Sequence, residues 1–198
     1  MKVVNILFVF FVLFSFDAFS EDGSSPKFSD YSTVISSGPF VNKVELTAVQ
    51  RGFSADWRSL IENELVKPVN FSGHYRLVIS KGGVLSKECG NDGWVCGWVI
   101  DKKTGRVVST LPEFNGNTKY FATIDNGTPS PDSFSIEYYP NSSLVWVSGQ
   151  NKPENGDFKQ TKCANAAYKY NANTFSVVTS SRCEIDTGDD EGADKYLP

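Results

Sequence analysis

One stretch of the chain carries apolar residues at helical spacing. They recur every three or four residues and therefore share one face of a helix: Trp57, Leu60, Ile61 and Leu65. Ser54 is a good N-cap, and Asp56 lies in the first turn, where it complements the helix dipole. Pro68 stops the helix near Val66. The pattern predicts an amphipathic helix that packs against a sheet, with a partner-binding face as the alternative.

Most of the remaining chain has the pattern of short strands. The strands that we expect are residues 44–49, 75–79, 94–100, 106–109, 133–139, 144–148, 166–170 and 175–179. The last six form three pairs, which flank turn signals at residues 101–105, 140–143 and 171–174. Strands joined by tight turns run antiparallel. The predicted fold is mainly β (α+β): an antiparallel β-sheet of successive hairpins, with the N-terminal helix packed on it.

The first twenty residues have the pattern of a secretory signal peptide. Lys2 supplies the positive charge, residues 3–16 are nearly all apolar, and Ala18 and Ser20 are the small residues of a cleavage site. We therefore expect residues 1–20 to be removed after Ser20 and the protein to be periplasmic or secreted. The alternative is an uncleaved membrane anchor, although the apolar run is shorter than the roughly 18 residues of a membrane span.

The rest of the chain divides into three parts. Residues 21–43 are rich in Ser, Gly and Asp and predict a loose N-terminal segment, whose aromatic residues can pack onto the domain. Residues 44–185 predict a single β-rich domain. Residues 186–198 predict an acidic, flexible tail. Asp186, Asp189 and Asp190 lie in this tail, but its glycines do not fall where a calcium loop needs its turn.

The cysteines and the net charge limit the kinds of site and partner that the chain can have. An even number of cysteines in an exported chain indicates disulfides, and the four are Cys89, Cys96, Cys163 and Cys183. We favour pairing the first with the second and the third with the fourth, since each pair flanks a turn; the other two pairings stay open. The spacing matches no common zinc site, and we expect no metal or cofactor. The net charge of -4, without a basic cluster, argues against nucleic acid and anionic membrane surfaces.

Few residues suit catalysis. His74 is the only histidine, so a serine-based triad would have to use it, and the chain lacks a Gly-x-Ser-x-Gly elbow. The favoured interpretation is structural: His74 bonds a loop to the sheet, and Asn70 caps the turn after the helix. Paired carboxylates, as in a glycosidase, remain an alternative through Glu113, Asp125 and Glu137. Whether the protein is an enzyme stays open, and a non-enzyme is favoured.

Three elements of the chain resemble a known family. They are residues 70–75 (Asn-Phe-Ser-Gly-His-Tyr), the Cys89–Cys96 element, and residues 100–107, which contain Asp-Lys-Lys-Thr-Gly. They are similar to small exported proteins of Gram-negative bacteria with Asn-Phe-Ala-Gly-His-Tyr, Cys-Gly-x-x-Cys and Asp-x-x-Thr-Gly. The resemblance covers residues 69–149 and departs from the family where five residues separate Gly90 from Cys96. It implies export to the periplasm and a fold rather than an activity.

These features favour a non-enzymatic binding protein. We expect a protein partner, with the chain serving as an inhibitor or immunity protein that blocks a toxin or a cell-wall hydrolase. Residues 85–96 are the expected contact loop, through Asp92 and Trp94, although Trp94 also suits the core. A secreted factor that acts on host or neighbouring cells, and a carboxylate-based hydrolase of envelope polymers, are the alternatives. The oligomeric state stays open.

Overall fold

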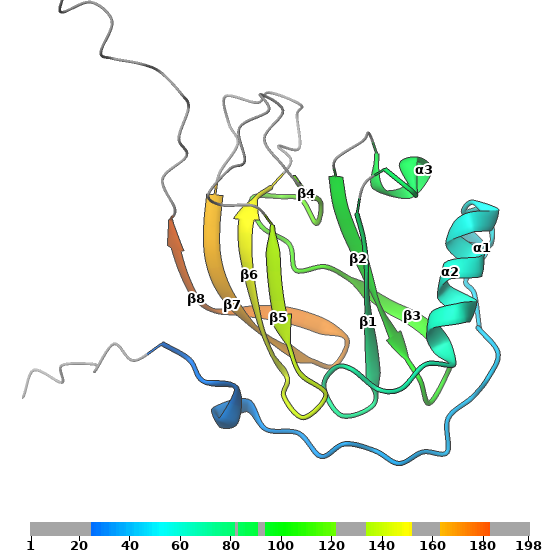
Figure 1. The fold of residues 1–198 in the computed structure, drawn as a ribbon, viewed down its shortest axis with the longest axis horizontal. Coiled ribbons are helices and arrows are strands. Elements are labelled where there is room, and N and C mark those ends of the chain that lie inside the picture. The colour runs from blue at the N-terminus through cyan, green and yellow to red at the C-terminus, as the bar shows by residue number, and fades with distance from the viewer. Residues whose placement is uncertain (1–24, 82, 91–93, 122–133, 152–162, 183–198) are drawn as a thin grey trace, which may run out of the picture.

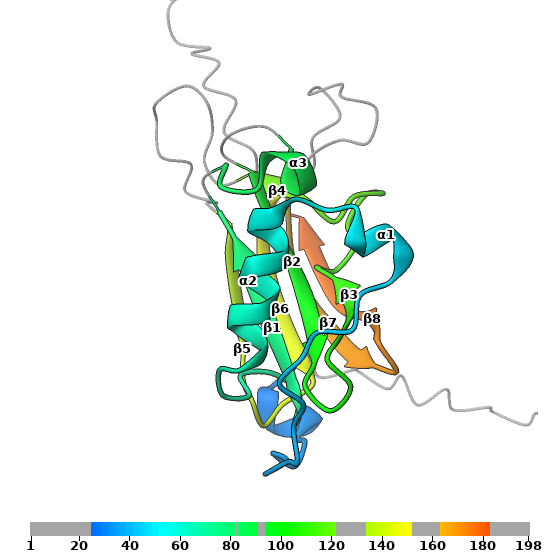
Figure 2. The same cartoon turned by 90° about the vertical axis from the view of Figure 1, so that its right-hand side faces the viewer.

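One helix and two antiparallel sheets lie in three layers in the computed structural model of this chain (Figures 1 and 2). The structure describes residues 25–81, 83–90, 94–121, 134–151 and 163–182. The predicted signal peptide and acidic tail lie outside these residues, as do Asp92, Asp125 and Cys183.

The first sheet is built around its central strand, β2 (Trp94–Asp101). β1 (Tyr75–Ser80) and β3 (Arg106–Thr110) pair with it on either side, both antiparallel. The two-residue strand β4 (Tyr120–Phe121) pairs with the beginning of β2. Seven consecutive residues of β2 are buried, because this strand has one packed layer on each of its faces.

The second sheet follows the order of the chain. Its strands are β5 (Ser135–Tyr138), β6 (Leu144–Gln150), β7 (Cys163–Asn171) and β8 (Thr174–Arg182), and all neighbours are antiparallel. The β7–β8 turn places Ala172 and Asn173 at φ 47° and 67°, as a tight hairpin of two residues requires. The three predicted hairpins are confirmed. They are divided between two sheets, however, where the sequence predicted one.

The predicted helix is confirmed as α2 (Ala55–Leu65). The Ser54 hydroxyl accepts a hydrogen bond from the backbone N–H of Trp57 at 3.1 Å, as an N-cap does. The described part of the chain also contains three short helices: η1 (Phe28–Tyr31), α1 (Ala48–Arg51) and α3 (Ser86–Cys89). No helix in the described part of the chain is long and apolar enough to span a membrane.

The strand predicted over residues 44–49 is wrong. Thr47 and Gln50 form a reciprocal capping box, which starts the short helix α1 instead. Only Glu45 pairs in this range, in a single parallel bridge to Arg106. The capping box satisfies backbone groups locally, so this segment has less need of a neighbouring strand.

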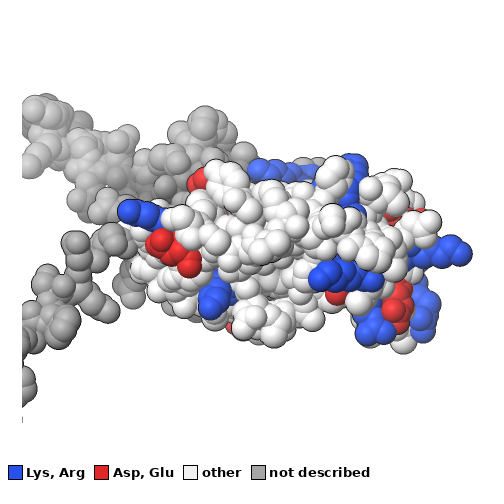
Figure 3. Space-filling model, turned by 90° about the horizontal axis from the view of Figure 1, so that it is seen from below, with Lys and Arg blue, Asp and Glu red and all other residues white. Residues whose placement is uncertain are grey.

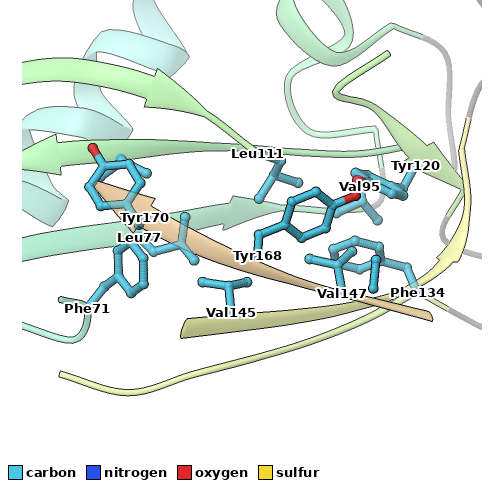
Figure 4. Close-up of a cluster of buried hydrophobic side chains, with 12 residues drawn as sticks. Phe71, Leu77, Val95, Leu111, Tyr120, Phe134, Val145, Val147, Tyr168 and Tyr170 are labelled. Carbon is cyan, nitrogen blue, oxygen red and sulfur yellow. The ribbon is translucent and has the colours of Figure 1, made fainter. Parts of the chain in front are cut away.

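The main hydrophobic core lies between the two sheets (Figure 4). Side chains from both inner faces meet there, and the cluster is Phe71, Leu77, Val95, Val99, Leu111, Tyr120, Phe134, Val145, Val147, Ala166, Tyr168 and Tyr170. Each large apolar side chain that becomes fully buried contributes about 1.5–3 kcal/mol of transfer free energy. This core is therefore the main source of stability for the sandwich.

A second core lies between α2 and the other face of the first sheet (Figure 2). Trp57, Ile61 and Leu65 of the helix are fully buried there against Trp98 and Ile100. The rings of Trp57 and Trp98 meet edge to face at 5.8 Å. The apolar face of the helix thus packs against the sheet, as its spacing predicted.

The local disulfide predicted between Cys89 and Cys96 is confirmed. It ties α3 to the beginning of β2. Cys163 begins β7 and is buried, while its predicted partner, Cys183, lies outside the described residues.

Residues 25–43 form an extended strap that crosses below both sheets (Figure 1). The composition predicted a loose segment over residues 21–43, yet the described part follows a defined path. The reason is that strap backbone groups hydrogen-bond to turns far along the chain, including Thr33 N–H to the Asn141 carbonyl at 2.8 Å. Ser142 also donates its hydroxyl proton to the Phe28 carbonyl at 2.9 Å.

The close packing of β2 makes Gly97 sensitive to substitution. A Cβ at this position would lie 2.5 Å from the Val78 carbonyl oxygen and 3.1 Å from a Leu111 methyl. We expect Gly97→Ala to lower the free energy of unfolding by about 1–3 kcal/mol in urea titrations. Gly52→Ala is the control, since its Cβ would meet only the Val49 carbonyl oxygen at 3.2 Å. Equal stability of the two variants would contradict this account.

Candidate functional site

Three turns and the strap come together at one end of the molecule, which is the lower end in Figure 1. The turns are residues 72–74, 101–105 and 139–142, and we call this region the strap end. The backbone N–H groups of Thr33 and Ser36 donate to turns 139–142 and 72–74 at 2.8 Å each. The backbone N–H of Val41 donates a hydrogen bond to the Lys102 carbonyl at 3.1 Å. Two of the motifs behind the family resemblance therefore hold the strap.

Asn70 acts as a substitute for a neighbouring strand. Its side-chain amide donates to the Leu77 carbonyl at 2.9 Å and accepts from the Leu77 N–H at 2.7 Å. Both backbone groups of Leu77 are thus satisfied at the edge of β1, where a buried unpaired group would be costly. The predicted role of Asn70 as a local cap is replaced by this longer-range pairing.

The next residues of the motif turn the chain sharply. Ser72 and Gly73 have φ values of 41° and 83°, and Phe71 before them is fully buried in the main core. A Cβ on Gly73 would lie 2.8 Å from the Val34 carbonyl oxygen. Glycine at this position therefore allows both the positive φ and the close approach of the strap.

His74 lies in a small polar cluster beside this turn. Its Nε2 is 3.6 Å from Oδ1 of Asp101, and its ring centroid is 4.0 Å from that of Tyr75. Burial, together with the positive charge of Lys103, lowers the pKa of His74, and the Asp101 carboxylate acts in the opposite direction. Within the described residues no hydroxyl is hydrogen-bonded to the imidazole. The backbone carbonyl of His74 also accepts a hydrogen bond from the Lys102 N–H at 3.2 Å, so His74 links the turn before β1 to the turn after β2.

Asp101 organises the turn between β2 and β3. Its carboxylate accepts from the Lys103 N–H at 2.8 Å and from the Thr104 hydroxyl at 2.9 Å. Gly105 has φ 76°, and a Cβ there would collide with the Lys43 carbonyl oxygen. The Asp-x-x-Thr-Gly element thus forms the turn through the hydrogen bonds of its Asp side chain, and its Gly leaves room for the strap.

Lys102 stabilises the fold through contacts that the sequence patterns did not predict. Its side chain is buried, and its ammonium donates to the carbonyls of Leu65 and Lys67, the second at 2.6 Å. It also lies 5.2 Å from the ring centroid of Phe40 in the strap. Burial and the positive charge of Arg76 lower the pKa of Lys102. The cation satisfies the carbonyl end of α2, where the helix dipole favours positive charge.

The strap end presents apolar side chains to solvent. Val34 is 91% exposed, Ile35 50% and Val41 38%, and Tyr139 in the neighbouring turn is 42% exposed. Seen from below, the middle of this face carries few charged residues (Figure 3). We call Val34, Ile35 and Val41 the apolar strap patch, and it is the candidate functional site of the protein.

The structure does not place Trp94 of the predicted contact loop on the surface. Trp94 is only 7% exposed in β2, where its ring meets Phe121 edge to face at 5.8 Å. This is the core position that the sequence allowed as the alternative. Asp92, the other expected contact residue, lies outside the described residues.

Two of the three expected carboxylates, Glu113 and Glu137, lie in the described part of the chain. Glu137 lies on β5 and accepts a hydrogen bond from the Tyr139 hydroxyl at 2.6 Å. Glu113 is exposed in the segment after β3, and Asp125 lies outside the described residues. Among the residues that the structure describes, no three metal-ligating side chains come together.

In comparisons with known proteins, no family model, curated sequence or solved structure matches this chain. The resemblance to small exported proteins of Gram-negative bacteria therefore stays a prediction from the motifs.

The role of Lys102 can be measured against its neighbour. We expect Lys102→Met to lower the free energy of unfolding by about 2–3 kcal/mol, because two carbonyls at the end of α2 lose a charged donor. Lys103→Met is the matched control, since Lys103 is exposed in the same turn. Urea unfolding of both variants checks this, and a loss of similar size in Lys103→Met would contradict it.

The pKa of His74 is directly accessible, because the chain has one histidine. We expect an NMR titration of the folded protein to give a value below the ordinary 6.5. The unfolded chain then binds the proton more tightly, so stability is fully present above about pH 6.5 and falls as the pH drops through the folded pKa. His74→Asn should flatten this fall between pH 7.5 and pH 5. A folded pKa above 6.5 would contradict the burial of the imidazole.

Proposed function

We propose that this protein is an exported, non-enzymatic binding protein that recognises a protein partner through the apolar strap patch. The observation that carries the proposal is the exposure of Val34 and Ile35 between two fixed points. Thr33 and Ser36, on either side, are hydrogen-bonded to the turns behind them. The two apolar side chains are therefore presented outward on a backbone that is held in place.

Such a fixed segment suits tight binding. A loop that is already ordered loses less conformational freedom when it meets its partner, so more of the contact energy appears as affinity. Buried apolar anchors surrounded by polar groups are typical of the energetic centre of a protein interface. Val34 and Ile35 supply the anchors.

The kind of partner follows from the predicted compartment. The predicted signal peptide ends only a few residues before the strap begins, and the Cys89–Cys96 disulfide suits an oxidising compartment. We propose a periplasmic or secreted inhibitor or immunity protein. It blocks a toxin or a cell-wall hydrolase by placing the apolar strap patch over the active-site cleft of that protein.

The proposal is tested with charged substitutions in the patch. Mature, oxidised protein is used to capture partners from envelope and culture fractions, and the captured protein is identified, purified and titrated. We expect Val34→Asp and Ile35→Asp to weaken its binding by about ten-fold or more, since each places a charge in an apolar contact. Inhibition of the partner's activity should fall in parallel.

Two other exposed valines provide matched controls. Val49 and Val84 are 74% and 73% exposed, away from the strap, so their substitution by Asp should leave binding unchanged. Thermal unfolding of all four variants shows that the fold is intact. Undiminished binding by the strap variants, or no saturable partner in either fraction, would overturn the proposal.

A further inference from the structure

A row of short polar residues crosses the outer face of the second sheet. The strand register aligns Ser135 of β5 with Ser148 of β6, Ser148 with Asn165 of β7, and Asn165 with Ser181 of β8. With strands about 4.8 Å apart, the row is about 14 Å long. It forms a continuous strip of groups that can both donate and accept hydrogen bonds.

This strip borders a shallow hollow of about 430 Å³. Six residues from the strap helix η1 and from three strands line it: Phe28, Ser135, Glu137, Trp146, Ser148 and Asn165. The hollow combines aromatic surface with convergent polar groups, which is the usual composition of a small-molecule site.

Trp146 is held in a fixed orientation at this hollow. Its indole N–H donates to the Pro26 carbonyl at 3.3 Å, and the register places it next to Glu137 on β5 and Ala167 on β7. It is half-buried, whereas Trp57, Trp94 and Trp98 are each at most 7% exposed. It is therefore the tryptophan whose ring a ligand in the hollow would contact.

The charges of the lining decide which ligands fit. Glu137 is the only charged residue among the six, and no Lys or Arg from the described part of the chain lines the hollow. The Tyr139 hydroxyl donates to Oε1 of Glu137, which leaves Oε2 as an acceptor. This composition disfavours phosphates and other anions and suits a neutral ligand that carries hydroxyl groups.

We propose that this hollow binds a neutral oligosaccharide. A sugar ring has hydroxyls that match the Ser148 and Asn165 side chains, and an apolar C–H face that packs on an indole ring. The extended row lets successive sugar rings follow the sheet from β5 toward β8. The site lies on the outer face of the second sheet, so it goes beyond the protein contact proposed for the strap patch.

Tryptophan fluorescence tests the proposal in the full mature protein. The probes are three soluble neutral trisaccharides: chitotriose, cellotriose and maltotriose. We expect at least one of them to give a saturable change in emission, with an isotherm that calorimetry reproduces. The trimer of galacturonic acid should bind more weakly than the best neutral sugar, because Glu137 repels its carboxylates.

Substitutions of residues that line the hollow test where the sugar binds. Trp146→Ala should weaken the affinity measured by calorimetry by about ten-fold or more, through the loss of the stacking surface. Ser148→Ala and Asn165→Ala remove single polar groups and should each weaken it by about five-fold, which corresponds to one ordinary hydrogen bond. Ser109→Ala, on β3 of the other sheet, is the matched control and should bind as the unaltered protein does.

Two results would overturn the inference. One is the absence of a saturable response to all three neutral sugars. The other is a sugar affinity that Ser148→Ala, Asn165→Ala and Trp146→Ala all leave unchanged while their melting temperatures show an intact fold. Val34→Asp, which disrupts the apolar strap patch, should leave sugar binding intact, so failure of either proposal is recognised separately.

Discussion

The burial of β2 on both faces is the constraint on which the rest of the structure depends. One face contributes Val95 and Val99 to the core between the sheets, and the other contributes Trp98 and Ile100 to the core under α2. Neither the helix nor the second sheet could bury its apolar side without this shared layer. The strand also carries Asp101 at its end, so the same element that unites both cores starts the turn that holds the strap.

The sequence was informative where a pattern is local. The helix and seven of the eight strands after it follow from apolar spacing and turn residues, whereas the two-residue strand β4 was not predicted. Cys89 and Cys96 were paired correctly because they lie close together in the sequence. The division into two sheets was missed, since hairpin signals identify neighbouring strands but not where one sheet stops. The short helix α1 was not predicted, because the Thr47 capping box that starts it lies within a strand-like run of apolar residues.

The strap end shows why the candidate site was harder to predict. Lys102 follows a strand and precedes Lys103 in a turn, where a lysine is ordinarily exposed. Its burial becomes visible only when the end of α2 is brought beside that turn. The composition of the strap predicts a loose segment because it does not reveal the backbone hydrogen bonds that this segment makes to residues far along the chain.

Those distant partners also determine when the strap can form. The hydrogen bond from Ser142 to the Phe28 carbonyl joins residues 114 positions apart, and that from Trp146 to the Pro26 carbonyl spans 120. Closing so long a loop costs entropy that only later contacts recover, so we expect this segment to fold more slowly than the hairpins. The strap is made early by the ribosome yet docks late, after β6 exists. Until the turns that receive it exist, the backbone N–H groups of Thr33 and Ser36 therefore lack the carbonyl partners that hold the strap in the folded protein.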